Sequence, residues 1–218
     1  IRNGIKRLLF VGRVSPEKGV HVLLEAFQKV ISRYPKAQLE IVGPTNVPLN
    51  FEWFWSLGLD DKVLRFASSF CHNPKGNYFS FLQKQLISLN IADNVTFTGF
   101  VPNSEMIKHY RDVDVVVNPS FSESFGRSLI EAMACEVPVV AARVGGMTEI
   151  VENGKTGILV EPGDADALAE AIIRLLSNED LRKSMGKAAR KRVVELYSWE
   201  RVAEKLLRHY KNICDGNG

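Results

Sequence analysis

The sequence has 218 residues, 45% of them apolar, and a formal net charge of +3. This length and apolar content suffice for a globular domain with its own core, whereas so weak a positive charge argues against a dedicated nucleic-acid-binding surface. The three scattered cysteines lack Cys-x-x-Cys spacing and the four histidines are dispersed, which argues against a disulfide framework or a metal cluster and favours a reducing compartment.

Apolar strands alternate with amphipathic helices along the chain. Continuous apolar runs predict strands at 7–12, 38–43, 95–98, 113–117, 137–141 and 157–160. Helical spacing predicts helices at 19–33, 79–89, 103–111, 124–135, 147–152, 165–177, 179–194 and 199–213. The alternation predicts an α/β fold, a Rossmann-like three-layer domain with a parallel sheet covered on both faces. Ligands of such sheets bind beyond the carboxyl ends of the strands, so the loops after strands are the places to look for chemistry.

Residues 44–85 interrupt this alternation with an aromatic-rich insertion. Its aromatic residues, with those of the helix that follows, are Phe51, Trp53, Phe54, Trp55, Phe66, Phe70, Tyr78, Phe79 and Phe81. One interpretation is a local cluster packed at the edge of the sheet. The others are a surface for an acceptor, lipid or protein partner, or a mobile lid.

The loop at 12–19 brings two cations to the carboxyl end of the first strand. Gly12 ends the strand, Gly19 opens a helix, and Arg13 and Lys18 lie between them. A planar guanidinium and a point-charge ammonium together suit a diphosphate, and the N-terminus of the following helix adds a positive dipole. The alternative interpretation is an ordinary solvated basic loop.

A second loop combines small residues with two carboxylates. The backbone N–H groups of Ser124, Phe125 and Gly126 are expected to be free anion donors at a helix start, and Gly126 would let a ligand approach the backbone closely. Glu123 precedes the helix and Glu131 lies about two turns into it. Carboxylates so far apart suit recognition of hydroxyls at two points; the alternative is a helix-dipole contact and a surface glutamate.

These motifs resemble the C-terminal domain of glycosyltransferase family 4. The matching segments are Gly-Arg-x-x-x-x-Lys-Gly at 12–19, Glu-x7-Glu at 123–131, Pro-Val-Val-Ala at 138–141, Gly-Gly-Met-Thr-Glu-Ile-Val at 145–151, Asn-Gly-Lys-Thr-Gly-Ile-Leu-Val at 153–160 and Tyr-Ser-Trp at 197–199. The resemblance covers nearly the whole chain except about 44–85, where family members commonly have a short loop and helix.

The resemblance implies a GT-B architecture, in which two Rossmann-like domains face each other across a cleft. Residues 1–218 would form the C-terminal, nucleotide-sugar (donor) binding domain, and the N-terminal acceptor domain would be absent from this sequence. Because the sequence lacks an initiator Met and runs straight into a strand, we expect that it begins at an interdomain boundary. The lack of a targeting segment in these residues is then weak evidence about where the protein is located.

The family also implies roles for individual residues. Three side chains would be catalytic, with Arg13 and Lys18 on the diphosphate and Glu123 on the hydroxyls of the donor sugar. Glu131 would bind the ribose. Further donor contacts would come from Gly12, Gly43, Phe100, Val101, Ser124, Phe125 and Gly126.

Enzymes of this family retain the anomeric configuration and need no metal or other cofactor. Physical chemistry agrees, since two preorganised cations and a helix N-terminus can stabilise a leaving diphosphate without Mg²⁺. We therefore expect hexose transfer from a nucleotide-diphosphate sugar, UDP-linked, to a glycan or lipid-linked acceptor, with no nucleic-acid partner. The isolated domain is expected to be inactive or very weak alone.

The expected location is the cytoplasm, with the inner face of the membrane as an option because of a lipid-linked acceptor. The sequence has no run of about 18 apolar residues that would span a bilayer. The basic helix at 179–194 is interpreted as a solvated face, and contact with anionic lipids, a peripheral membrane contact, is the alternative.

Two other functions stay open. One keeps the fold but changes the reaction, to a nucleotide-sugar epimerase or a glycan phosphorylase; a phosphorylase would need pyridoxal phosphate on a lysine, and nothing in the sequence marks one. The other is a non-catalytic nucleotide-sugar-binding module. The intact cation pair and both glutamates argue against a decayed site.

Overall fold

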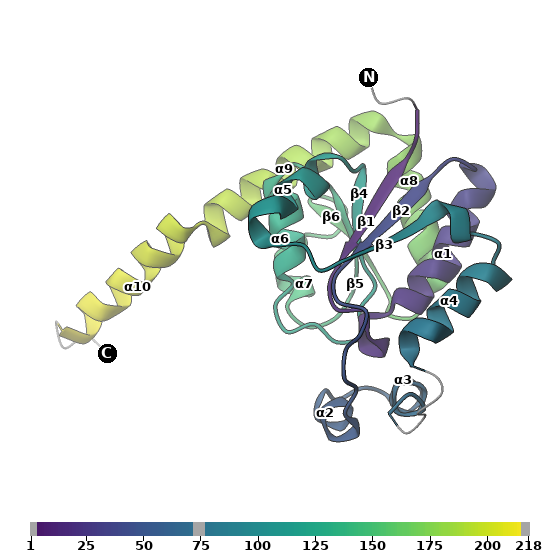
Figure 1. Ribbon diagram of the computed structural model, residues 1–218. Coiled ribbons are helices and arrows are strands. Elements are labelled where there is room, and N and C mark those ends of the chain that lie inside the picture. Colours follow the sequence, from purple (N-terminus) through teal and green to yellow (C-terminus); the bar gives the residue numbers. More distant parts are fainter. Residues whose placement is uncertain (1–3, 72–76, 215–218) are drawn as a thin grey trace.

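The computed structural model, which describes residues 4–71 and 77–214, has one six-stranded parallel sheet (Figure 1). Its strands are β1 (Arg7–Val11), β2 (Gln38–Val42), β3 (Val95–Gly99), β4 (Val115–Asn118), β5 (Val139–Ala142) and β6 (Gly157–Val160). Their spatial order is β3-β2-β1-β4-β5-β6. This order confirms the predicted fold class and puts a topological switch point between β1 and β4, where ligands bind in open parallel sheets.

Helices cover both faces of the sheet (Figure 1). The α-helices of the described residues are α1 (Val20–Arg33), α2 (Phe51–Ser56), α3 (Asp61–Ser68), α4 (Tyr78–Ser88), α5 (Asn103–Arg111), α6 (Arg127–Ala134), α7 (Met147–Ile150), α8 (Ala165–Ser177), α9 (Glu179–Tyr197) and α10 (Trp199–Cys214). Short 3-10 helices lie at η1 (Pro16–Lys18) and η2 (Ala92–Asn94).

The central strand β1 shows why the strands are apolar throughout. Successive side chains of a strand point to opposite faces of the sheet. Leu8 and Phe10 join a core formed with α1, α4 and α8, whereas Leu9 joins a second core formed with α5, α6 and α9. Because both faces are covered, no position of the strand's interior can be polar without a partner.

The predicted helix at 124–135 begins later than expected, at Arg127. Gly126 caps it with φ of 89°, in the left-handed region that glycine adopts without strain. Residues 119–126 therefore form a longer loop at the carboxyl end of β4. A Cβ at Gly126 would meet Ile150 at 3.3 Å and Met147 at 3.4 Å, so its missing side chain faces the apolar core. Close approach of a ligand to this backbone stays a prediction.

The aromatic-rich insertion at 44–85 contains α2, α3 and the first part of α4; residues 72–76 lie outside the described part. The ring of Phe66 packs edge to face against those of Phe70, Tyr78 and Phe81, Tyr78 and Phe81 stack on each other, and the ring centre of His21 on α1 lies 4.4 Å from that of Phe66. This confirms the interpretation of a local cluster for these rings. Burial lowers the pKa of His21 to about 4, so His21 is neutral at physiological pH.

The C-terminal helix α10 projects away from the rest of the domain (Figure 1). None of its side chains is buried, and its exposed apolar residues are Trp199, Val202, Leu206, Leu207, Tyr210 and Ile213. Within residues 4–71 and 77–214, no helix combines the length and apolarity needed to cross a membrane.

Ion pairs engage most of the basic side chains on α9, the helix predicted at 179–194. The pairs are Arg182–Asp114, Lys183–Glu179, Arg190–Glu136, Lys191–Glu195 and Arg192–Glu152. Their charges are therefore partly neutralised within the domain, which favours the solvated-face interpretation over a lipid-binding surface.

Gly43 follows β2 at a point where its backbone lies against that of Gly12, the residue after β1. Gly43 has φ of 143°, and a Cβ there would lie 1.9 Å from the carbonyl oxygen of Gly12. Gly43→Ala should therefore lower the free energy of unfolding by at least about 2 kcal/mol, measured by urea denaturation. Gly58→Ala is the control, because Gly58 also has a positive φ, 62°, but a methyl group added there would meet nothing within 4 Å; equal losses in the two variants would contradict the steric explanation.

Candidate functional site

A cavity of about 280 Å³ opens at the carboxyl edge of the sheet, beside the switch point between β1 and β4. Its walls come from the loops after β1, β2, β3 and β4 and from the first turns of α5 and α6. The predicted site residues that line it are Gly12, Arg13, Gly43, Phe100, Val101, Glu123 and Glu131. Residues far apart in the sequence thus meet because parallel strands end at the same edge.

Two glycines bring the first two loops together. The N–H of Gly12 donates to the carbonyl of Val42 at 2.9 Å, and the N–H of Gly43 donates to the carbonyl of Gly99 at 2.8 Å. These bonds continue the sheet ladder one residue beyond the strands. The cavity therefore has a floor of fixed backbone, and Gly43 leaves no side chain above it.

Arg13 extends along one wall of the cavity. Its guanidinium Nη2 lies 3.4 Å from Oε1 of Glu17, and the hydroxyl of Ser15 donates to the same oxygen at 2.5 Å. Glu17 is buried, and its Oε2 has no hydrogen-bond partner within the described residues. Nothing in the spacing of the loop at 12–19 marks Glu17 as buried or as a partner of Arg13.

Lys18 forms an ion pair with Glu123 from the loop after β4. Its Nζ donates to Oε2 of Glu123 at 2.9 Å and to the carbonyl of Ser122 at 3.2 Å. Both side chains are mostly buried, with exposed fractions of 15% and 18%, so solvent screens this attraction little. The pair joins two loops that are separated by about a hundred residues of sequence.

The remaining oxygen of Glu123 accepts backbone hydrogen bonds. The N–H groups of Phe125 and Gly126 lie 3.3 and 3.1 Å from Oε1. The expectation that these two amides are free anion donors is therefore wrong, because the chain supplies the anion itself. Together with Ser124 and Lys18, they are described residues of the predicted site that do not line the cavity.

The environment of Glu123 holds it in its charged form. Burial alone would raise the pKa of this carboxyl, but the hydrogen bond and the charge of Lys18, with the amides of Phe125 and Gly126, outweigh it and lower the pKa below its ordinary value of 4.5. Glu123 is thus a carboxylate at neutral pH, whose further lone pairs can accept hydrogen bonds from hydroxyls in the cavity.

Tyr110 orients Glu131, the second carboxylate in the cavity. The buried hydroxyl of Tyr110 donates to Oε2 of Glu131 at 2.7 Å, and Nε of Arg127 lies 3.5 Å from Oε1. Burial, and then the hydrogen bond to Glu131, raise the pKa of Tyr110, so the phenol stays protonated and keeps donating. No motif or spacing in the sequence marks Tyr110 as a residue of the site.

Among the described residues, no group of three or more His, Cys, Asp or Glu side chains is placed to hold a metal ion. The expectation of a reaction without a metal or other cofactor stays a prediction.

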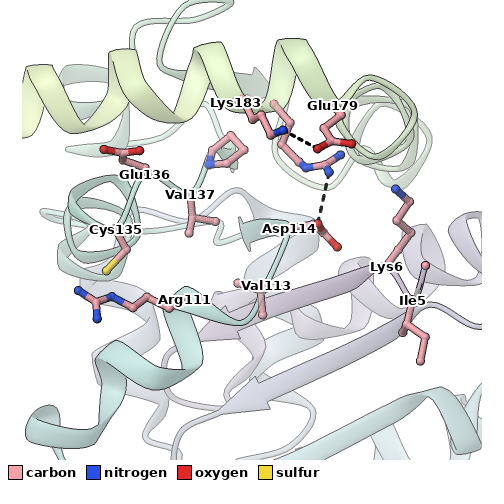
Figure 2. A pocket seen from close by; sticks show the side chains of 13 residues that line it. Ile5, Lys6, Arg111, Val113, Asp114, Cys135, Glu136, Val137, Glu179 and Lys183 are labelled. Atoms are coloured by element: carbon pink, nitrogen blue, oxygen red, sulfur yellow. Dashed lines mark ion pairs between the residues drawn. The ribbon is translucent and has the colours of Figure 1, made fainter. Parts of the chain in front are cut away.

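A second cavity, of about 420 Å³, lies at the opposite edge of the sheet, where β1, β4 and β5 begin (Figure 2). Charged side chains line it, but two ion pairs within it, Lys183–Glu179 at 2.6 Å and Arg182–Asp114 at 3.5 Å, are internal to the protein. Although it is larger, it lies away from the carboxyl ends of the strands and contains none of the predicted site residues.

Comparison with known proteins relates the chain to glycosyltransferases. Residues 1–192 match the family described as glycosyl transferases group 1. The chain is 33% identical over 207 residues to the D-inositol 3-phosphate glycosyltransferase of Corynebacterium urealyticum, an alignment that covers 94% of this chain and 42% of that protein. The chain spans less than half the length of such curated relatives.

Solved structures show the same fold. Sucrose-phosphate synthase from Thermosynechococcus elongatus superposes with a TM-score of 0.76 at 30% identity, covering 97% of this chain and 46% of that one. TarM of S. aureus, in a complex with fondaparinux, alpha-GlcNAc-glycerol and UDP, superposes with a TM-score of 0.72 at 26% identity, covering 94% and 35%. These likenesses match the fold expected for one half of a GT-B protein.

The Lys18–Glu123 pair predicts a pH-dependent contribution to stability. Because the pKa of Glu123 is lowered in the folded state, its contribution is fully present above about pH 5 and is lost as the pH falls through the folded-state value. Urea denaturation should show that Glu123→Gln is less stable than wild type at pH 7 and that this difference shrinks toward about pH 3.

Glu170→Gln is the control, because Glu170 is an exposed residue of α8. Its free energy of unfolding should equal that of wild type at each pH. If Glu123→Gln is less stable than wild type by the same free energy of unfolding at pH 7 and at pH 3, the ion pair does not account for the difference.

Proposed function

This chain belongs to the glycosyl transferases group 1 family, and we propose on that basis that it is the donor-binding half of a retaining glycosyltransferase. The reaction would move a hexose from a UDP-sugar to a glycan or lipid-linked acceptor. The observation that carries the proposal is the cavity at the carboxyl edge, which gathers a guanidinium, two oriented carboxylates and exposed backbone in one place.

The diphosphate of the donor would bind at Arg13 and Lys18. A guanidinium can donate two parallel hydrogen bonds to phosphate oxygens. Lys18 neutralises Glu123 at 2.9 Å, so an anionic donor would approach the carboxylate without facing an uncompensated negative charge. As the glycosidic bond breaks, negative charge develops on the leaving diphosphate, and cations held in place beforehand stabilise it.

The two carboxylates would divide recognition of the donor's hydroxyls. Glu123, fixed by Lys18 and two backbone amides, would accept hydrogen bonds from the hexose. Glu131, fixed by Tyr110 and Arg127, would accept them from the ribose. The base would lie against the backbone of Phe100 and Val101, beyond β3.

UDP is the proposed nucleotide because a related structure, TarM of S. aureus, is described in complex with UDP. The acceptor site would lie largely in the remainder of the full-length protein, since this chain spans less than half of its relatives. We place the enzyme in the cytoplasm, because Cys71, Cys135 and Cys214 are free thiols; contact with the inner face of the membrane would serve a lipid-linked acceptor.

The direct test of the donor proposal is thermal stabilisation of this chain by UDP, GDP and ADP in the presence of EDTA. A ligand at about 100 times its Kd stabilises a fold by roughly 2.7 kcal/mol. UDP should raise the unfolding temperature of wild type and not that of Arg13→Ala. If no nucleoside diphosphate shifts wild type, or if UDP shifts both equally, the proposed donor site is wrong.

Turnover by the full-length enzyme tests the catalytic roles. Arg13→Ala and Lys18→Ala should each lower kcat at least about a hundredfold, because each removes a charge that stabilises the leaving diphosphate. Arg174→Ala is the matched control, since Arg174 is exposed at the end of α8, outside the cavity lining.

Near-normal turnover in Arg13→Ala or in Lys18→Ala would contradict the role assigned to that residue. Donor binding without any transfer by the full-length wild-type enzyme would favour the non-catalytic module instead.

A further inference from the structure

The aromatic-rich insertion at 44–85 contacts a charged side chain of the candidate donor site. The guanidinium carbon of Arg13 lies 4.6 Å from the centre of the Trp53 ring on α2. This is well within the roughly 6 Å over which an aromatic face attracts a cation. The insertion is therefore in direct contact with the cation assigned above to the diphosphate.

We propose that Trp53 is a positioning residue of the donor site, which holds the Arg13 guanidinium where it meets the diphosphate. This proposal rests on the proposed function of Arg13. It assigns the insertion, at its first helix, to donor recognition, in addition to the local aromatic cluster formed by its later part.

Arg13 needs such support because its ion pair with Glu17 does not fix it. That pair is long, at 3.4 Å, and reaches a single oxygen that Ser15 already occupies at 2.5 Å. The Arg13 side chain is 45% exposed, so without a further contact it would sample several rotamers. An aromatic face restricts the plane of the guanidinium and thereby lowers the entropy lost on binding.

Trp53 can hold Arg13 because α2 packs against α3, and α3 packs against η1 in the loop that carries Arg13. The next residue, Phe54, is fully buried, and the side chain of Asn50 caps the helix by accepting from the N–H of Trp53 at 3.0 Å. The N–H of Val14, beside Arg13, donates to the carbonyl of Pro44 at 2.9 Å, at the start of the insertion. The loop that carries Arg13 and the segment that carries Trp53 are thus tied together.

The contact with Trp53 leaves the guanidinium available for a ligand. A guanidinium has five N–H donors, and Nη2 of Arg13 directs one of them toward Glu17 at 3.4 Å, which leaves others for phosphate oxygens. Arg13 can therefore keep its contact with Trp53 while donating to phosphate oxygens, so the indole is a support and not a competitor for the diphosphate.

Binding of UDP and of uridine to this chain, measured by titration calorimetry in EDTA, tests the proposal. Trp53→Ala should weaken UDP binding about two- to tenfold and leave uridine binding unchanged, because uridine lacks the diphosphate that Arg13 contacts. Trp53→Phe, which keeps an aromatic face, should recover most of the loss. Trp55→Ala is the matched control, since Trp55 lies on the same helix but is 67% exposed, and its ring lies tilted at 6.3 Å from that of Phe51.

A double-variant cycle separates positioning from a general loss of structure. In an Arg13→Ala background, Trp53→Ala should cause no further loss of UDP affinity, because the supported group is gone. The proposal is overturned if Trp53→Ala binds UDP like wild type, weakens uridine equally, or adds its full effect to that of Arg13→Ala. Failure of wild type to bind UDP would instead refute the donor site itself.

Discussion

The ion pair between Lys18 and Glu123 is the interaction on which the arrangement of the site depends. It bridges the loops after β1 and β4 across the switch point of the sheet, at 2.9 Å and with both side chains mostly buried. Removing either partner would leave a charge in a poorly solvated place, which is costly. The loops are thereby held in one arrangement, and Glu123 in turn orders the start of α6 by accepting from the amides of Phe125 and Gly126.

Around this pair, the charged and polar groups of the cavity are held in position by neighbouring residues before any ligand binds. Tyr110 orients Glu131, Trp53 and Glu17 flank Arg13, and the Gly12–Gly43 contact sets the floor. Preorganisation of this kind lowers the reorganisation needed when charge develops on a leaving group. It also explains why the insertion at 44–85 belongs with the site: one of its helices supports a cavity residue, while its later rings pack on α1.

Sequence alone predicts most of the fold and the place of the site, for identifiable reasons. The strands are apolar throughout because helices cover both faces, so their positions can be read from the sequence. Once the strands are placed, the rule that ligands bind beyond their carboxyl ends brings Arg13, Gly43 and Glu123 to the same edge. The resemblance at 12–19 and 123–131 added roles that the spacing by itself left open.

What could not be predicted depends on side-chain contacts, one of them local and two between distant segments. The amides of Phe125 and Gly126 read as free donors, because nothing in the sequence shows that Glu123 folds back onto them. Nothing in the sequence marks Tyr110 as a site residue, since its hydroxyl matters only when α5 lies beside Glu131. The contact of Trp53 with Arg13 joins the insertion to a loop distant in sequence, a pairing that neither periodicity nor motif spacing encodes.

The most direct measurement is the mapping of backbone amide NMR shifts of this 24.4 kDa chain during titration with UDP in EDTA. The account predicts that shifts change around Gly12, Val101 and Gly126 and at the indole N–H of Trp53, while residues at the opposite edge, such as Glu136 and Lys183, stay unchanged. Changes confined to that opposite edge, or none at saturating UDP, would contradict the assignment of the carboxyl-edge cavity as a donor site.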